Sequence, residues 1–486
     1  MSNTSPGGGK VISGFLWSFA ERCGAQAVTF IVGLILARLL TPDDYGTVAI
    51  MTVFTGLLTV FVDSGLAASL IQKKDADDAD FSTVFYFNVG FCLFLYMVLF
   101  FCAPLISSSY GDASLTAPLR VLGITIIVSG LKNVQHAYVS KTLQFRLFFF
   151  STLGGTIVAA VVGIVMAYLG FGVWAIVTQH LTNLVIDTCV LWVTTGWRPK
   201  KLFSFTRLKS SFSYGWKILA SALLSTLITD IRQIIIGYRY SASDLSYYNK
   251  GSQLPSMITN NINTAIDSVL FPALSSVQSE QERIREMTRK SIRVSTYLIL
   301  PLVTGLAVCA EPFIRILLTE KWISCAPYLQ LFCITSALHP IHTSNLNAIK
   351  ALGRSDIFLK LDIVKKAVGI IILIITIPFG PLAIAVGLVF GSLISQFINS
   401  FPNKKLLNYT YLQQVYDMLP YIALSAVMGG CVYLINFLHL SDWASLAIQI
   451  PLGAIIYIGG SILFKMETYH YLLDILKASF KKMKRK

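Results

Sequence analysis

Long apolar runs joined by short connections constrain this chain more than any other feature of its sequence. About fourteen runs can be separated by hydropathy, and each is close to the length that crosses the roughly 30 Å hydrocarbon core of a bilayer as a helix. We place them at 11–40, 46–71, 82–107, 115–140, 147–169, 173–195, 212–237, 246–277, 292–318, 325–349, 357–379, 381–401, 417–438 and 443–464. The sequence therefore predicts an all-α polytopic membrane protein with about 14 transmembrane helices.

Composition agrees with a membrane protein. Mean hydropathy is +0.67, and 13% of the 486 residues are charged, against about 25% in soluble proteins. The net charge of +15 comes from Lys and Arg in the connections, so we interpret it as a topology signal and expect no nucleic-acid partner. The eight cysteines lie singly in apolar runs without zinc-site spacing, and we expect neither disulfides nor a metal site.

The connections alternate in charge along the chain. Basic connections include 198–209, 283–293 and the tail 477–486, whereas the intervening ones, such as 41–44 and 379–381, are poor in Lys and Arg. The positive-inside rule then predicts that both termini are cytoplasmic. Residues 11–27 loosely resemble a cleavable signal peptide, but the apolar run continues to residue 40, and we interpret it as a retained first helix. No connection exceeds roughly twenty residues, so we expect no soluble domain.

An internal repeat organises these runs. Residues 41–46 (TPDDYG) correspond to 241–246 (SASDLS), and 171–176 (FGVWAI) correspond to 379–384 (FGPLAI), with an offset of about 200 to 209 residues at five places. The repeat predicts two six-helix bundles related by pseudo-two-fold symmetry, plus two C-terminal helices. The predicted domains are a first bundle at 1–197, a cytoplasmic linker at 198–211, a second bundle at 212–402, and two accessory helices with a basic tail at 403–486.

The chain resembles a known group of exporters through three short motifs: ARLLTPDDYG at 37–46, LFPAL at 270–274 and EKW at 320–322. With the six-plus-six-plus-two helix pattern, these are similar to the polysaccharide (O-antigen) flippases of the colanic-acid and teichuronic-acid exporter type. These belong to the multidrug/oligosaccharidyl-lipid/polysaccharide exporter superfamily. The resemblance covers nearly the whole chain.

The resemblance implies two bundles that alternate between inward-open and outward-open states. The implied cargo is an oligosaccharide repeat unit on undecaprenyl pyrophosphate, moved from the inner to the outer leaflet of the bacterial cytoplasmic membrane for lipopolysaccharide, capsule or exopolysaccharide synthesis. The implied partners are this lipid-linked oligosaccharide, membrane lipid, a polysaccharide polymerase and other export proteins. No enzymatic activity and no cofactor are implied, and a proton or sodium gradient supplies the energy.

Cations inside apolar runs are candidate ligands of the pyrophosphate. Lys and Arg donate charge-assisted hydrogen bonds to phosphate oxygens, and Arg does so bidentately. The candidates are Arg22, Arg38, Lys132, Lys217 and Arg232, with Arg239 near the end of its run. The alternative is that these side chains extend to the membrane interface, an interpretation that is strongest for Arg38, near the predicted outer end of its run.

Carboxylates inside the runs are candidate ion-coupling groups, because a buried carboxyl that alternates between charged and neutral forms can couple transport to a gradient. The candidates are Asp63, Asp267, Asp230 and Glu21, and Asp187 and Glu311 belong to the same class. Asp63 and Asp267 are equivalent in the repeat, although a repeated Asp-Ser can equally be a structural element of a helix end.

Other functions fit the sequence less well. His339 and His342 lie about one helical turn apart, but two ligands do not make a metal site, and polar helix packing is the better interpretation. The GGGK at 7–10 lacks the spacing of a phosphate-binding loop. A cation-coupled multidrug antiporter of the same superfamily is the alternative function, and mixed charges with several cations argue against it. A membrane enzyme would need a catalytic loop or domain for which the short connections leave no room.

Overall fold

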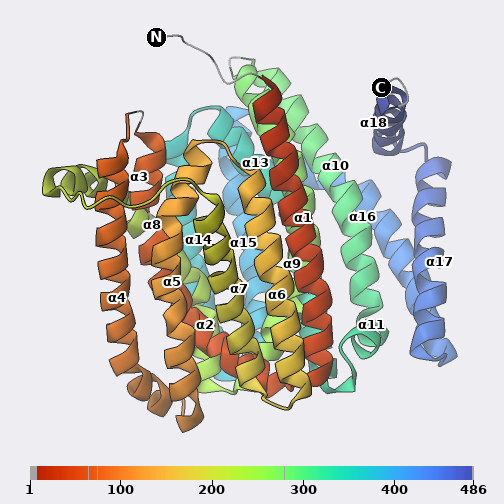
Figure 1. Cartoon of the computed structure of the whole chain (residues 1–486). Coiled ribbons are helices and arrows are strands. Elements are labelled where there is room, and N and C mark those ends of the chain that lie inside the picture. Colours follow the sequence, from red (N-terminus) through yellow and green to blue (C-terminus); the bar gives the residue numbers. More distant parts are fainter. Residues whose placement is uncertain (1–7, 64, 74, 279, 484–486) are drawn as a thin grey trace. The chain divides into compact units, whose positions relative to one another are not determined.

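The structure is a computed structural model that describes residues 8–63, 65–73, 75–278 and 280–483 (Figure 1). All regular elements among these residues are helices, and none is a strand. The contacts divide the chain into two compact units, Met1–Ser246 and Tyr247–Lys486. The predicted all-α membrane fold is therefore confirmed at the level of its class.

The first unit contains eight α-helices in its described part. They are α1 (Gly8–Leu39), α2 (Pro42–Asp63), α3 (Leu66–Gln72), α4 (Asp78–Ser109), α5 (Thr116–Lys141), α6 (Arg146–Tyr168), α7 (Val173–Thr194) and α8 (Phe205–Arg239). The predicted run 46–71 is thus two helices, separated around Gly65, whose φ of +101° is a conformation that glycine adopts readily.

The second unit begins within α9 (Ala242–Ser276). It continues with α10 (Gln281–Val308), α11 (Ala310–Leu317), α12 (Ala326–Ala337), α13 (His339–Ala351), α14 (Ser355–Thr376), α15 (Pro381–Leu406), α16 (Tyr411–Leu434), α17 (Asp442–Leu463) and α18 (Glu467–Met483). The predicted runs 292–318 and 325–349 are each interrupted. The interruptions fall near Cys309 and Leu338, close to Pro312 and Pro340, which favour the first turn of a new helix.

Ten helices of the described chain are long and apolar enough to cross a membrane. They coincide with ten of the predicted runs. The runs at 11–40, 246–277, 325–349 and 357–379 are also helical but are not among the ten. The count of fourteen spans, the pseudo-two-fold symmetry and the predicted domain boundaries stay predictions.

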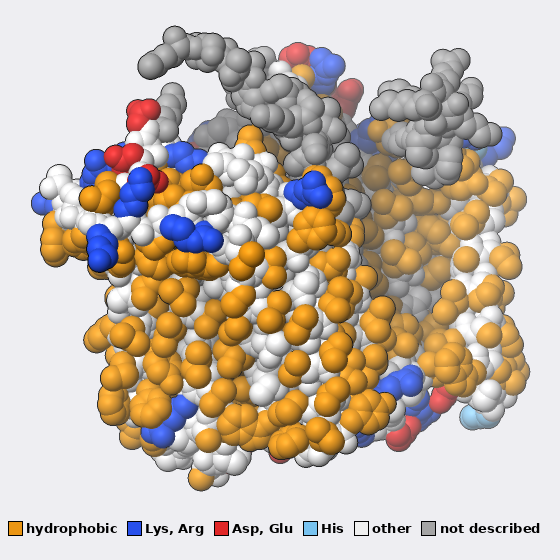
Figure 2. Space-filling view, in the orientation of Figure 1, with side chains coloured by type: hydrophobic (Ala, Val, Ile, Leu, Met, Phe, Trp, Pro, Cys, Tyr) orange, Lys and Arg blue, Asp and Glu red, His pale blue; other side chains and the backbone are white. Residues whose placement is uncertain are grey.

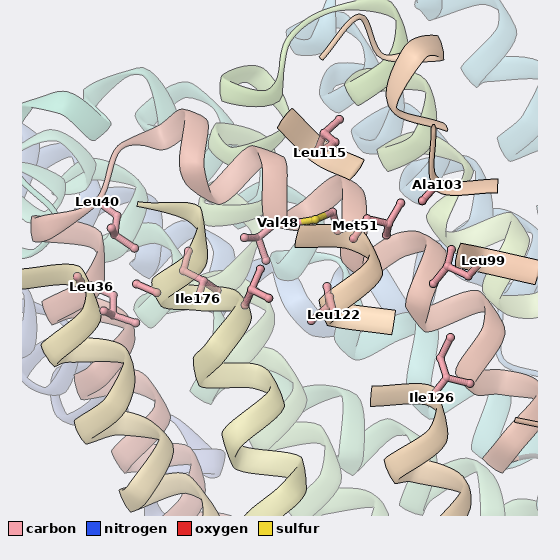
Figure 3. Close-up of a cluster of buried hydrophobic side chains, with 14 of the residues drawn as sticks. Leu36, Leu40, Val48, Met51, Leu99, Ala103, Leu115, Leu122, Ile126 and Ile176 are labelled. Carbon is pink, nitrogen blue, oxygen red and sulfur yellow. The ribbon is translucent and has the colours of Figure 1, made fainter. Parts of the chain in front are cut away.

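The core of the first unit lies where α1, α2, α4, α5, α6 and α7 meet (Figure 3). Met51 and Ile126 are fully buried there, and Leu36 is 2% exposed. The face of this unit visible in Figure 2 shows many hydrophobic and few charged side chains over the middle of α4, α5 and α6, while Lys and Arg lie towards the two ends of these helices. Side chains such as Phe101 and Leu105 are two-thirds exposed on that face. A surface of this kind is suited to lipid rather than to water.

The two segments matched by the repeat, 41–46 and 241–246, have the same local structure. Thr41 Oγ1 donates to Asp44 at 2.6 Å and accepts from the Asp44 amide at 3.2 Å. Ser241 Oγ and Asp244 make the same two bonds at 2.7 and 3.0 Å. Each hydroxyl thus caps the start of a helix, α2 or α9, which explains why these short motifs resemble each other.

Buried polar side chains connect three helices of the second unit. The Asn345 amide on α13 donates to Gln414 Oε1 on α16 at 2.7 Å and to Ser400 Oγ on α15 at 3.1 Å. The side-chain oxygen of Asn345, Oδ1, accepts a hydrogen bond from Asn403 Nδ2 at 2.6 Å. Apolar contacts alone give little drive for helix association in lipid, so bonds of this kind help to specify which helices pair.

Candidate functional site

An ion pair in the interior of the first unit is the centre of the candidate site. Lys132 Nζ on α5 lies 2.5 Å from Asp187 Oδ2 on α7. The Asp187 side chain is 7% exposed and that of Lys132 is 24% exposed. Among the described residues, the second carboxylate oxygen, Oδ1, is buried without a hydrogen-bond partner. One oxygen of a buried carboxylate is therefore held by the ammonium, and the other is unsatisfied.

Close approach of α6 and α7 positions the Asp187 carboxylate. A methyl group on Gly155 of α6 would lie 2.8 Å from the Asn183 carbonyl oxygen and 3.2 Å from Asp187 Cβ. Glycine at this position lets the two helices touch beside the ion pair. The sequence places Lys132 on α5 and Asp187 on α7 at facing positions, which the contact between these helices then brings together.

Two further titratable groups lie on the helices around this pair. Glu21 Oε1 on α1 accepts a hydrogen bond from Thr152 Oγ1 on α6 at 3.2 Å. His136, one turn after Lys132, stacks on the Phe148 ring with centroids 4.3 Å apart. The helices around the ion pair therefore also carry a carboxylate on α1 and an imidazole on α5.

Three of the other predicted cations lie on α1 and α8. Arg38 is exposed in the last turn of α1, and Lys217 is exposed on α8, where Arg232 is half-buried. Neither Lys217 nor Arg232 belongs to an ion pair in the described part of the chain. The side chain of Arg22 lies outside the described residues, so its predicted role stays a prediction.

The predicted coupling carboxylates lie in separate places. Asp230 on α8 accepts from Gln233 Nε2, one turn later, at 3.2 Å. Asp267 on α9, in the second unit, accepts from Asn347 Nδ2 on α13 at 2.6 Å. The side chain of Asp63 lies outside the described residues, so its predicted role stays a prediction.

The histidines on α13 contact polar neighbours. His339 Nδ1 lies 3.0 Å from Asn263 Nδ2 on α9, and His342 Nδ1 lies 2.6 Å from Asn399 Nδ2 on α15. The described residues contain no group of three or more His, Cys, Asp or Glu side chains that would hold a metal ion. Each ring is thus a polar helix contact.

Sequence reasoning missed two charged sites. Lys250 Nζ on α9 lies over the Trp322 ring, 5.7 Å from its centroid. In the sequence, the Trp of the EKW motif was the one feature that pointed to this site. Asp417, 3% exposed, accepts two hydrogen bonds from Arg289 at 2.6 and 2.7 Å and one from Tyr409 at 2.7 Å. Arg293 adds a contact at 2.8 Å. The Asp417 carboxylate is saturated, so this network is structural.

Residues 35–327 match a family described as polysaccharide biosynthesis protein. The chain belongs to this family. Its sequence is 25% identical to lipopolysaccharide biosynthesis protein WzxC of Escherichia coli (strain K12) over 444 residues, covering 86% of this chain and 88% of the relative. It is 22% identical to succinoglycan biosynthesis transport protein ExoT of Rhizobium meliloti (strain 1021), covering 70% and 69% of the two chains. The resemblance that the motifs indicated is confirmed.

A solved structure extends the comparison to the fold of this polysaccharide biosynthesis family member. The lipid II flippase MurJ, in an inward closed conformation, superimposes with a TM-score of 0.75, covering 94% of this chain and all of the other at 16% identity. That similarity establishes the fold. With ten helices long and apolar enough to cross a membrane, the chain is a multi-span membrane protein of the polysaccharide biosynthesis family.

Proposed function

We propose that the chain is a flippase for undecaprenyl-pyrophosphate-linked oligosaccharide repeat units. It would move them from the inner to the outer leaflet of the bacterial cytoplasmic membrane by alternating access, with both chain termini cytoplasmic. The observation that carries this proposal is the Lys132–Asp187 pair, because a cation on a membrane-spanning helix is costly and is usually kept for a substrate or ion path.

Lys132 is the proposed contact for the pyrophosphate. An ammonium group binds phosphate oxygens by charge-assisted hydrogen bonds. In the absence of substrate, Asp187 neutralises the ammonium, so the empty protein does not hold an unpaired charge in the membrane. Arg22, Arg38, Lys217 and Arg232 are proposed as further contacts along the path of the headgroup.

A proton or sodium gradient is the proposed energy source, with no cofactor. Glu21, Asp63, Asp230 and Asp267 are the proposed coupling carboxylates. Asp187 joins them, since its unsatisfied oxygen can take up a proton or a cation when Lys132 leaves it for the phosphate. The proposed partners are the lipid-linked oligosaccharide, a polysaccharide polymerase and other export proteins.

Cells that depend on this chain for a surface polysaccharide provide the test. Loss of the chain should abolish the polysaccharide and make its lipid-linked repeat unit accumulate, and wild-type protein should restore both. Lys132→Gln and Arg22→Ala, present in the membrane at the wild-type level, should not restore them. Normal polysaccharide with either variant would remove that residue from the site. The multidrug antiporter function would instead be assigned by two results together. Cells that lack the chain would make an unchanged amount of polysaccharide, and the protein would carry out gradient-driven efflux of a cationic dye.

A further inference from the structure

The segment between α7 and α8, with the start of α8, lies along the start of α4; we call residues 198–212 the shelf. The Lys200 amide donates to Ser82 Oγ at 2.9 Å, and the Ser204 amide donates to Thr83 Oγ1 at 3.1 Å. Figure 1 shows the shelf in yellow-green beside α4, on the left. It is therefore fixed to the first unit by bonds from its backbone to α4.

Acidic residues at the start of α4 neutralise part of the shelf. Lys200 Nζ lies 2.6 Å from Asp78 Oδ2. Arg207 pairs with Asp77 and, at 3.2 Å, with Asp80. These pairs attach the shelf to α4, and they also occupy two of its cations, so Lys200 and Arg207 are not available to a ligand.

Two lysines of the shelf, Lys201 and Lys209, take no part in these ion pairs and are exposed. The shelf is one of the basic connections that the positive-inside rule places in the cytoplasm. Anionic lipid headgroups give the cytoplasmic leaflet a negative surface potential that attracts such residues. The two lysines are thus placed at the level of a membrane surface of opposite charge.

An apolar groove of about 640 Å³ lies between the shelf and α4. It is lined by Phe87, Phe205, Thr206, Leu208, Lys209 and Phe212. Phe205 is 78% exposed and Phe212 is 48% exposed, which is costly in water and favourable against a hydrocarbon chain. Figure 2 shows hydrophobic side chains next to Lys and Arg side chains where the shelf projects. Lys209 belongs to the groove itself, so a cation lies at the rim of an acyl-sized apolar surface.

We propose that the shelf binds an anionic glycerophospholipid of the cytoplasmic leaflet. An acyl chain lies against Phe205 and Phe212, and the phosphate accepts hydrogen bonds from Lys209 and Lys201. Charge complementarity selects the headgroup, because Lys200 and Arg207 are already paired with α4. The guanidinium of Arg198, the fifth shelf cation, donates to backbone carbonyls at the end of α7 and between α7 and the shelf. This site is separate from the Lys132–Asp187 pair and does not depend on what the protein transports.

Photo-crosslinking in nanodiscs tests the proposal. The full chain is placed in phosphatidylcholine containing a small fraction of a phosphatidylglycerol or phosphatidylcholine analogue with a diazirine on its acyl chain. Labelled peptides are then identified by mass spectrometry. We expect the phosphatidylglycerol analogue to label the peptides that contain Phe87 and 203–212 in preference to the phosphatidylcholine analogue. Lys201→Gln/Lys209→Gln should reduce that preference by about 5-fold for each lysine.

The control pair is Lys404→Gln/Lys405→Gln, two exposed lysines in the last turn of α15. It should leave the labelling of the shelf unchanged. Phe205→Ser/Phe212→Ser should reduce labelling by both analogues equally, because it removes the apolar surface and not the charge. Equal labelling by the two headgroups in the wild-type protein, or an undiminished preference in the shelf variant, would overturn the proposal. So would displacement of the phosphatidylglycerol analogue by a polyprenyl phosphate, which would assign the groove to the substrate chain.

Discussion

Lys132 and Asp187 depend on each other because both charges are removed from bulk water. A buried carboxylate that keeps one oxygen unsatisfied already bears a desolvation cost, and its bond to the ammonium offsets only part of it. Such a pair contributes little net stability when intact and costs much when half of it is removed. The pair is therefore assigned to the proposed transport function rather than to stability.

Asp187→Leu should therefore lower the free energy of unfolding by about 3 kcal/mol, because Lys132 is left without its partner. The double variant Lys132→Met/Asp187→Leu should recover most of this loss while remaining inactive in transport. Thermal unfolding of the purified protein, followed by the loss of monodisperse material, measures the difference. A single variant as stable as wild type would show that the pair is not a coupled unit.

Tyr409 donates a hydrogen bond to the buried Asp417 carboxylate. Burial, followed by the neighbouring Asp417, raises the pKa of Tyr409 above its ordinary value, so the phenol stays a neutral donor at physiological pH. Tyr409→Phe should destabilise the second unit by about 1.5 kcal/mol. Tyr416→Phe, which changes a side chain that is 70% exposed, is the matched control. Equal melting temperatures for the two variants would contradict this role of the hydroxyl.

At the residue scale, the sequence indicated candidate charged residues in the apolar runs but not which of them meet. Lys132 and Asp187 both stood out as ionisable groups in apolar runs. The two residues are 55 positions apart in the sequence and meet only because α5 contacts α7. A contact between distant helices leaves no pattern in the local sequence. Lys250 was missed altogether because its run was defined by apolar residues and the Trp322 ring that covers it is distant in sequence.

At the scale of helices, the start of α2 lies against the start of α9. A methyl group on Gly46 would lie 1.7 Å from the Ala242 carbonyl oxygen, so no side chain fits there without moving the backbone. The capped helix starts at Thr41 and Ser241 hold both backbones in place. Glycine is thus required at this crossing by the contact between two elements.

Gly46→Ala should destabilise the protein by about 1 to 3 kcal/mol, because an overfilled contact must be relieved by displacing a helix. Gly56→Ala, on the same helix, is the control. A methyl group there meets nothing within 4 Å, and alanine favours a helix over glycine by up to about 1 kcal/mol. The melting temperature should fall for Gly46→Ala and stay level or rise for Gly56→Ala. The reverse order would contradict the close contact between Gly46 and Ala242.

The start of α4 supplies a test of pH dependence. A hydrogen bond from the Asp80 amide lowers the pKa of Asp77 below its ordinary value, with a further contribution from Arg207. A lowered folded-state pKa adds stability that is present above the unfolded value and is lost as pH falls through the folded value. Wild-type protein should melt above Asp77→Asn at pH 7, and the two should converge below about pH 4. A difference that stays constant with pH would contradict this account.

Helix boundaries were predicted less well than the helices themselves. Hydropathy located the apolar runs, because the bilayer sets their length. It did not locate the interruptions near Cys309 and Leu338, since a short break at a proline leaves a window of apolar residues nearly unchanged. The prolines at 312 and 340 were visible in the sequence and carry that signal.

At the scale of the whole molecule, membrane-protein class and family could be predicted from hydropathy, alternating loop charge and three motifs. Hydropathy follows from the lipid around each helix, and loop charge follows from the side of the membrane on which each loop lies, so both leave a pattern along the entire chain. The number of spans, the relation between the two halves and the substrate path depend on packing between distant segments. For that reason they remain predictions, and function has to be measured directly.

The most direct measurement is transbilayer movement of a purified undecaprenyl-pyrophosphate oligosaccharide by the full chain in proteoliposomes, with and without a pH or sodium gradient. The account predicts gradient-dependent movement that is absent from protein-free vesicles and from Lys132→Gln at equal reconstitution. No movement under any gradient by wild-type protein, or movement by Lys132→Gln at the wild-type rate, would contradict it.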